Sequence, residues 1–158
     1  MYKGIMEYIN KNPNNYPDAV IATDIQEREG EYQFPHEVGE KYDFLSDNYK
    51  NNFNTPIDYI IMNPPYSVIE PFVMKSLGLA EKGILMLCRL QFLEGKSRYE
   101  NILKDNPPSD IWVYVDRISC YKNGNDKEKM ASAQAYCWAY WNLQKENNDT
   151  KIHWIRRK

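Results

Sequence analysis

One stretch of the chain limits its fold more than any other: residues 58–66, Asp-Tyr-Ile-Ile-Met-Asn-Pro-Pro-Tyr. The apolar run from Ile57 to Met62 is short and is followed at once by two prolines, which is typical of a buried parallel strand rather than a helix. Two consecutive prolines cannot continue a central strand, because neither donates a hydrogen bond to the sheet. Asn63 precedes a proline and is therefore biased towards an extended backbone. The sequence thus predicts a stiff loop at the carboxyl end of a buried strand, where open α/β sheets bind their ligands.

The residue types in this loop suit an amino group attached to a planar ring. Asn63 and Pro64 offer two neighbouring carbonyl acceptors, and Tyr66 offers an aromatic face. The stretch Asn63-Pro64-Pro65-Tyr66 resembles the Asn-Pro-Pro-Tyr motif of amino-group methyltransferases, and the sequence is most similar to the adenine-N6 DNA methyltransferases. The resemblance implies that these four residues are catalytic: Asn63 and Pro64 would hold the adenine amino group while Tyr66 stacks on the extruded base. A four-residue match also arises by chance, and it then marks only a turn.

Length and composition set the class of protein. With 158 residues, 42% hydrophobic and 14% aromatic, the chain has the size and composition of one globular domain. No apolar run is long enough for a transmembrane helix, and no signal-peptide core follows the start, so we expect a soluble cytoplasmic protein without membrane contact. A net charge of −2 provides no general attraction for nucleic acid. Three widely spaced cysteines and two isolated histidines predict neither disulfides nor a metal site.

The segments around the proline loop fit one α/β sheet. Residues 19–24 and 83–88 are further short apolar runs that predict strands. The apolar stripe from Val68 to about Glu81 predicts a helix between them. This helix should start in a capping box, Ser67 to Glu70, and stop at Lys82-Gly83. The order strand, helix, strand predicts a parallel βαβ unit. A helix should also carry Tyr99, Ile102 and Leu103, and strands should form near 110–115, 133–141 and 151–155.

The resemblance implies the rest of the architecture. It pairs the segments around 110–115 and 133–141 as the antiparallel hairpin that closes a class I methyltransferase. The expected fold is therefore a Rossmann-like class I methyltransferase sheet, mostly parallel with an antiparallel C-terminal hairpin, in a single domain over residues 1–158. A second Asn-Pro-Pro sequence, at residues 106–108, follows a helix and has no aromatic residue behind it, so we interpret it only as a chain break.

The resemblance also points to residues that would bind S-adenosylmethionine (SAM). Asp24 ends an apolar run, as do the acids that bind ribose hydroxyls in dinucleotide-type folds. It would then be the ribose ligand, with Ile25 as a wall for the adenine ring; the alternative is that Asp24 caps the next segment. Asp43 and Phe44 resemble a motif whose acid binds the amino group of the cofactor's adenine, with Asp47 as an alternative acid.

Phe92 follows the run at 83–88 and resembles a residue that walls the target-base pocket. The alternative for Phe92 is plain packing in the hydrophobic core, which is the commoner role of such a residue.

The start of the chain departs from the family pattern. In the related dinucleotide fingerprint the glycine-rich turn lies about 20 residues ahead of the ribose-binding acid, and that distance back from Asp24 reaches Gly4. Gly4 would be the last glycine of the turn, so the first strand and most of the turn would be missing. We therefore expect an N-terminally truncated domain with weak or absent SAM binding and with self-association through the gap left by the missing strand. A late start codon, an engineered deletion or a decayed prophage gene would each explain such a sequence.

Other functions stay open at this point. The same four residues occur in methyltransferases that act on a glutamine amide of release factors, and similar ones occur in ribosomal-RNA guanine enzymes. A non-catalytic remnant of a prophage methyltransferase is a further alternative. The Phe-Leu-Glu-Gly segment at 92–95 and the aromatic final hairpin resemble small phage-type adenine enzymes, which favours DNA. The expected function is thus SAM-dependent methylation of an exocyclic amino group, with adenine N6 in DNA as the leading substrate and no metal ion required.

Overall fold

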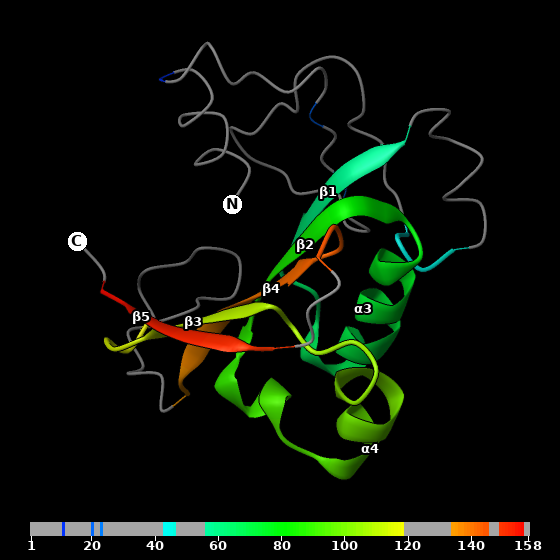
Figure 1. Cartoon of the computed structure of the whole chain (residues 1–158). Coiled ribbons are helices and arrows are strands. Elements are labelled where there is room, and N and C mark those ends of the chain that lie inside the picture. Colours follow the sequence, from blue (N-terminus) through cyan, green and yellow to red (C-terminus); the bar gives the residue numbers. More distant parts are fainter. Residues whose placement is uncertain are drawn as a thin grey trace, which may run out of the picture. The chain divides into compact units, whose positions relative to one another are not determined.

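The computed structural model describes residues 11, 20, 23, 43–46, 56–118, 134–145 and 149–156. The chain divides into two compact units, residues 1–53 and 54–158. In the first unit, Lys11 is helical and residues 43–46 form a turn. The second unit holds all of the described strands (Figure 1). The single domain expected over residues 1–158 stays a prediction.

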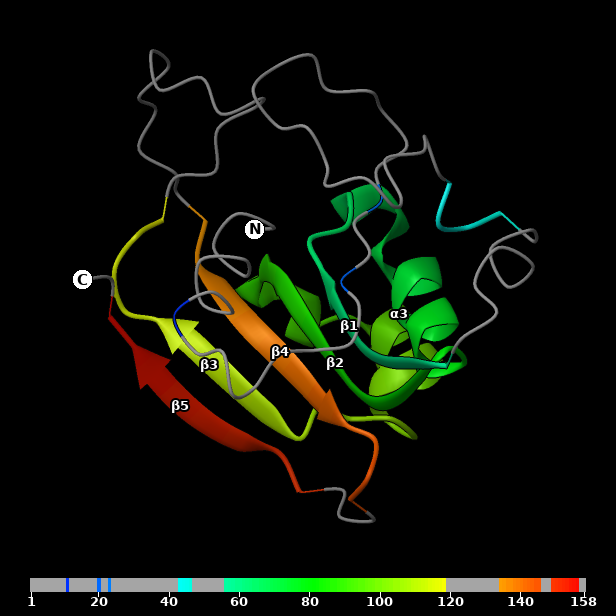
Figure 2. The same ribbon diagram turned by 90° about the horizontal axis from the view of Figure 1, so that it is seen from above.

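A five-stranded mixed sheet forms the second unit, in the order β1-β2-β4-β3-β5 (Figure 2). Its strands are β1 (Ile57–Met62), β2 (Ala80–Arg89), β3 (Asp110–Tyr114), β4 (Tyr136–Asn142) and β5 (Lys151–Ile155). β1 is parallel to β2, and β3 is parallel to β5, whereas β4 runs antiparallel to both β2 and β3. The α/β class and the antiparallel pairing of β3 with β4 are confirmed. The described sheet is mixed rather than mostly parallel, because β4 lies between two strands that it opposes.

Short helices join the strands and cover one face of the sheet (Figure 1). They are η2 (Tyr66–Val68), α3 (Ile69–Leu77), η3 (Leu90–Leu93), α4 (Lys96–Arg98) and η4 (Tyr99–Leu103). Because η2 and α3 connect β1 to the parallel strand β2, the predicted βαβ unit is confirmed. The helix expected around Tyr99 is present, but its last part, η4, is wound as a π-helix.

The core lies between the helices and the face of the sheet that they cover. Alternate strand residues point to this face, and they meet apolar residues from the helices. The buried cluster consists of Met62, Ile84, Met86, Cys88, Ile111, Cys137, Ala139 and Trp141 from the strands, Ala80 at the start of β2, and Ile69, Val73, Phe92 and Ile102 from the helices. Removing this apolar surface from water is the main force that holds the helices on the sheet.

The predicted start of α3 is wrong. No side-chain cap forms at its first turn, and the helix begins at Ile69 rather than in a Ser67 capping box. Ser67 lies in the preceding turn η2, and the carboxylate of Glu70 accepts hydrogen bonds from Ser97 Oγ at 3.2 Å and Asn101 Nδ2 at 3.3 Å. The carboxylate that should close the capping box therefore ties α3 to the helical segment 96–103 instead.

The predicted end of α3 is also wrong. The helix ends at Leu77 with Gly78 as its C-cap, and Lys82-Gly83 lies inside β2. Gly83 is needed there for close packing, because a Cβ atom at this position would meet the Tyr140 ring at 2.9 Å and the Trp141 carbonyl oxygen at 3.0 Å. The glycine that was expected to stop the helix instead lets β4 approach β2.

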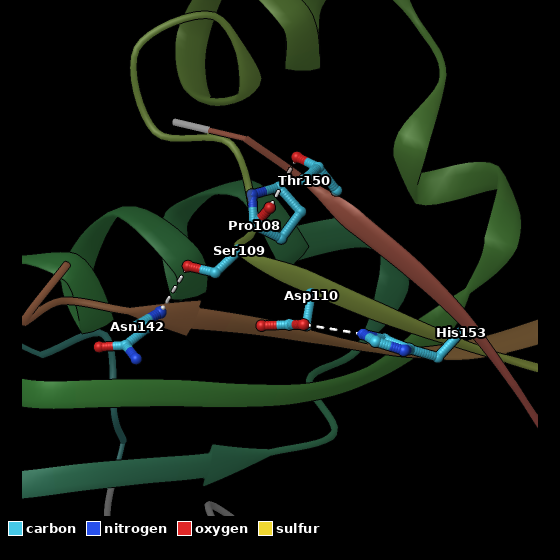
Figure 3. Close-up of polar contacts among 6 residues, drawn as sticks. All are labelled: Pro108, Ser109, Asp110, Asn142, Thr150 and His153. Carbon is cyan, nitrogen blue, oxygen red and sulfur yellow. Dashed lines mark hydrogen bonds and ion pairs between the residues drawn. The ribbon is translucent and has the colours of Figure 1, made fainter. Parts of the chain in front are cut away.

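Residues 106–109, which contain the second Asn-Pro-Pro sequence, join three strands. The Asn106 carbonyl accepts a hydrogen bond from Trp141 Nε1 at 2.9 Å. The Pro108 carbonyl accepts one from Thr150 Oγ1 at 2.7 Å, and Ser109 Oγ accepts one from the Asn142 N–H at 2.9 Å (Figure 3). Hydrogen bonds of this segment thus connect β3, β4 and the start of β5.

Candidate active site

The loop from Asn63 to Tyr66 lies at the carboxyl end of β1, as predicted. Met62, the last residue of β1, pairs with Met86 in the parallel strand β2, so both strands end at the same edge of the sheet. Pro64 is buried and anchors the loop, whereas Asn63 is exposed. The Pro65 carbonyl accepts a hydrogen bond from the Val68 N–H at 3.1 Å, which closes the turn into η2. The loop therefore holds Asn63 at the surface on a stiff backbone.

Tyr66 is half-buried and is held by residues from two other strands. The guanidinium carbon of Arg89, the last residue of β2, lies 4.2 Å from the centre of the Tyr66 ring. The ring of Tyr136, the first residue of β4, lies 6.5 Å away at an angle of 47°. Arg89 and Tyr136 pair across the antiparallel ladder, and the Leu90 N–H donates to the Ala135 carbonyl at 2.8 Å beside them. An arginine and two tyrosines thus meet at the edge that carries Asn63.

Arg89 brings a positive charge to this edge, and no described acidic side chain pairs with it. It is half-buried, its Nε is buried without a hydrogen-bond partner, and its guanidinium makes no hydrogen bond or ion pair within the described part of the chain. Arg98 differs, because its Nε and an Nη donate to the carbonyls of Glu94 and Gln91 at 2.8 and 3.2 Å. The contact with Tyr66 is a cation–π interaction, which compensates in part for the burial of Arg89.

The other predicted site residues are Phe92 and those expected to bind SAM. Gly4, Asp24 and Ile25 lie outside the described residues, so their roles stay predictions. Asp43 and Phe44 belong to the turn of the first unit, where Asp43 Oδ1 accepts a hydrogen bond from the Leu45 N–H at 2.9 Å. Such a contact is the usual side-chain cap of an Asx turn.

Phe92 lies in η3 and belongs to the hydrophobic core. It is 4% exposed, and its ring meets that of Trp141 edge to face with centres 6.3 Å apart. This placement fits the packing alternative for Phe92, and a role at a base pocket stays a prediction.

Sequence reasoning missed Arg89 and Tyr136. Neither stands in a recognisable motif, and they are 47 residues apart in the chain by their numbers. Their neighbourhood depends on the register of β2 against β4, in which Cys88 also faces Cys137. The only signal was the alternation along the expected strand 83–88, which would place Arg89 on the face opposite Cys88.

Two further observations concern ligands and membranes. Within the residues that the structure describes, no three His, Cys, Asp or Glu side chains gather to hold a metal ion. None of the helices in that part of the chain is long and apolar enough to cross a membrane.

Comparisons with known proteins add little to this geometry. No protein-family model matches the chain, and no curated protein matches it. Among solved structures, the complex of M1.HpyAVI with SAM is similar to this chain with a TM-score of 0.34 and 14% identity, over 69% of this chain and 61% of that one. The chain therefore spans less than two thirds of the length of that protein. A similarity of this size does not establish a shared fold, and the cofactor in the complex belongs to that protein.

Proposed function

We propose that this protein is an SAM-dependent methyltransferase of exocyclic amino groups, with adenine N6 in DNA as its substrate. The observation that best supports the proposal is the loop at the end of β1, which holds an exposed Asn63 and a half-buried Tyr66; the Asn63 side chain and the Pro64 backbone each carry a carbonyl acceptor. An amino group on a planar base has two N–H donors for these acceptors and a face for the ring. The position of the loop at the carboxyl end of a parallel strand agrees with where α/β sheets bind ligands.

In this proposal, the chain's own residues prepare the amino group for reaction. The amine nitrogen of adenine is a poor nucleophile, because its lone pair is delocalised into the ring. The carbonyl oxygens of Asn63 and Pro64 accept hydrogen bonds from the two N–H groups of this nitrogen. These bonds favour a more pyramidal nitrogen and stabilise the positive charge that develops on it. Tyr66 replaces part of the stacking that the base loses when it leaves the duplex. When SAM is bound it supplies an electrophilic methyl group.

The residues proposed to hold SAM are Gly4, Asp24, Ile25, Asp43 and Phe44. Asp43 is exposed, and one of its carboxylate oxygens accepts a hydrogen bond from the Leu45 N–H. A carboxylate can accept further hydrogen bonds, so Asp43 suits the amino group of the cofactor's adenine. Isothermal titration of the protein with SAM measures this binding directly, and no detectable binding would contradict the proposal.

Methyl transfer tests the proposed function. The protein is incubated with saturating SAM and unmethylated DNA, and the digested nucleosides are analysed by mass spectrometry for N6-methyl-deoxyadenosine. Asn63→Ala should abolish the product. Asn106→Ala is the matched control, since Asn106 also precedes two prolines and its hydrogen bonds to other described residues come from its backbone: the N–H donates to the Ile102 carbonyl, and the carbonyl accepts from Trp141 Nε1.

The same assay separates the competing functions. A methylated glutamine in a release-factor peptide, with unmodified DNA, would favour the protein amide substrate. Turnover that survives in Asn63→Ala would remove this residue from the mechanism. No product on DNA, RNA or peptide at saturating SAM would favour a non-catalytic protein.

A further inference from the structure

We propose that Arg89 binds a phosphate group of the substrate beside Tyr66, so that the Asn63–Tyr66 loop takes a nucleotide and not an amide side chain. This inference rests on the proposed function, because it assigns a substrate class to the same site. It adds a residue that belongs to none of the motifs recognised in the sequence.

Arg89 has hydrogen-bonding capacity that the described residues do not use. Its Nε–H is buried without an acceptor, and its guanidinium has no hydrogen-bond or ion-pair partner among the described residues. A buried donor without a partner lowers stability, so such groups are rare and call for an explanation. Arg98 and Lys82 show the usual pattern in this chain, since Arg98 binds two carbonyls and Lys82 pairs with Asp58 at 3.0 Å. An anionic ligand would give Arg89 the acceptor that the described residues do not provide.

Arg89 also lies next to the proposed base site. Its guanidinium carbon lies 4.2 Å from the centre of the Tyr66 ring, and Tyr66 directly follows the two prolines of the loop. A base that stacks on Tyr66 carries its sugar and phosphates with it. The phosphates would then lie no farther from the guanidinium than the length of one nucleotide. Arg89 is also the last residue of β2, at the edge of the sheet where a ligand of β1 would bind.

The chemistry of arginine suits a phosphate ligand. A guanidinium is planar, always charged and able to bind phosphate through two parallel N–H donors, which makes arginine the preferred residue for such anions. The cation–π contact with Tyr66 uses the charge of Arg89 but no N–H···O hydrogen bond, so the two roles are compatible. A glutamine side chain carries an amino group but no anion. The combination of Asn63, Tyr66 and an Arg89 whose Nε has no acceptor among the described residues therefore matches a nucleotide.

The test compares three ligands: 2′-deoxyadenosine, deoxyadenosine 3′,5′-bisphosphate and the corresponding abasic deoxyribose bisphosphate. Their dissociation constants are measured at low salt for the wild-type protein, Arg89→Met, Arg89→Lys and Lys82→Met. Lys82→Met is the matched control, because it removes one positive charge from the opposite end of the same strand. Circular dichroism checks that each variant is folded, and Arg89→Lys keeps a cation beside Tyr66 if the methionine variant is unstable.

The proposal predicts that the wild-type protein binds the bisphosphate more tightly than the nucleoside. Arg89→Met should weaken bisphosphate binding about tenfold or more, since charge-assisted hydrogen bonds are lost, and should change nucleoside binding by less than about threefold. Arg89→Lys should fall between the two for the bisphosphate, because it keeps the charge without the paired donors. Lys82→Met should behave as the wild type.

Two results would overturn the proposal: equal affinity of the wild type for nucleoside and bisphosphate, or equal losses for both ligands in Arg89→Met. The second result would mean that Arg89 acts only through Tyr66. The abasic bisphosphate separates this inference from the proposed function. If the nucleoside fails to bind but the abasic bisphosphate binds and is lost in Arg89→Met, the adenine site is wrong while the phosphate site stands.

Discussion

The guanidinium of Arg89 lies over the ring of Tyr66, with 4.2 Å between its central carbon and the ring centre. This contact connects the end of β2 to the loop that follows β1, and Tyr136 tilts against the same ring at 6.5 Å. The ring that is proposed to stack on a base is therefore held by residues of two strands. A group that is held before the ligand arrives loses less conformational freedom on binding.

Replacement of Tyr66 tests the stacking role. Tyr66→Ala should weaken binding of 2′-deoxyadenosine about tenfold, because stacking of a base on an aromatic side chain contributes about 1–3 kcal/mol. Tyr66→Phe keeps the ring and should stay within about threefold of the wild type. Equal losses in both variants, measured by calorimetry, would show that the hydroxyl group rather than the ring face carries the effect.

The close approach of β2 and β4 predicts a difference between two glycines. Gly83→Ala should lower the free energy of unfolding by about 1–3 kcal/mol, since the new Cβ would meet the Tyr140 ring at 2.9 Å and a strand carbonyl at 3.0 Å. Gly78→Ala is the control: the nearest atom to its Cβ is a helix carbonyl oxygen at 3.6 Å, and its backbone is helical. Urea unfolding of Gly78→Ala should show unchanged or slightly increased stability.

The elements that the sequence predicted well are those whose patterns are local. The apolar run 57–62 bounded by prolines is β1, residues 151–155 are β5, and the stripe after Ser67 is α3. The loop at the end of β1 was located from its prolines alone. Chain order also predicted the parallel pairing of β1 with β2, since the helix between them returns the chain to the end of the sheet where β1 begins.

The features that the sequence did not predict depend on contacts between distant segments of the chain. Glu70 looks like part of a capping box until the segment 96–103 supplies Ser97 and Asn101 as its donors. The glycine at 83 looks like a helix stop until β4 packs against it. Arg89 meets Tyr136 only because β4 pairs with β2 in one particular register. No residue pattern within one element carries this information.

The contacts of Glu70 predict a tether between α3 and the segment 96–103. Glu70→Ala should lower the free energy of unfolding by about 1 kcal/mol, because it removes the acceptor for Ser97 Oγ and Asn101 Nδ2. Glu100→Ala is the control, since Glu100 is exposed and its ion pair with Lys104 is long, at 3.9 Å. If both variants unfold at the same urea concentration, the tether has no energetic role.

The two core cysteines predict a dependence of stability on pH. Cys88 and Cys137 are free and buried, with their sulfur atoms 3.6 Å apart. The hydrogen bond between them and the burial of the thiol raise the pKa of Cys88 above its usual value of 9.0. The folded state therefore keeps a proton that the unfolded state releases, so the contribution of Cys88 is complete below that value and is lost as the pH rises above it.

Urea unfolding at a series of pH values measures this effect. From neutral pH to well above the usual thiol pKa, the free energy of unfolding should fall more steeply for the wild type than for Cys88→Ala. The variant should start from a lower stability, because it leaves a small cavity in the core. Parallel curves for the two proteins would show that ionisation of Cys88 does not contribute.

The most direct test of the amine site compares two nucleosides that differ only in the amino group. The site predicts that 2′-deoxyadenosine binds about tenfold more tightly than purine 2′-deoxyriboside, because only the former donates hydrogen bonds to Asn63 and Pro64. Asn63→Ala should reduce this difference strongly, and Asn106→Ala should retain it. Equal affinity of the wild-type protein for the two nucleosides, measured by calorimetry, would contradict the site.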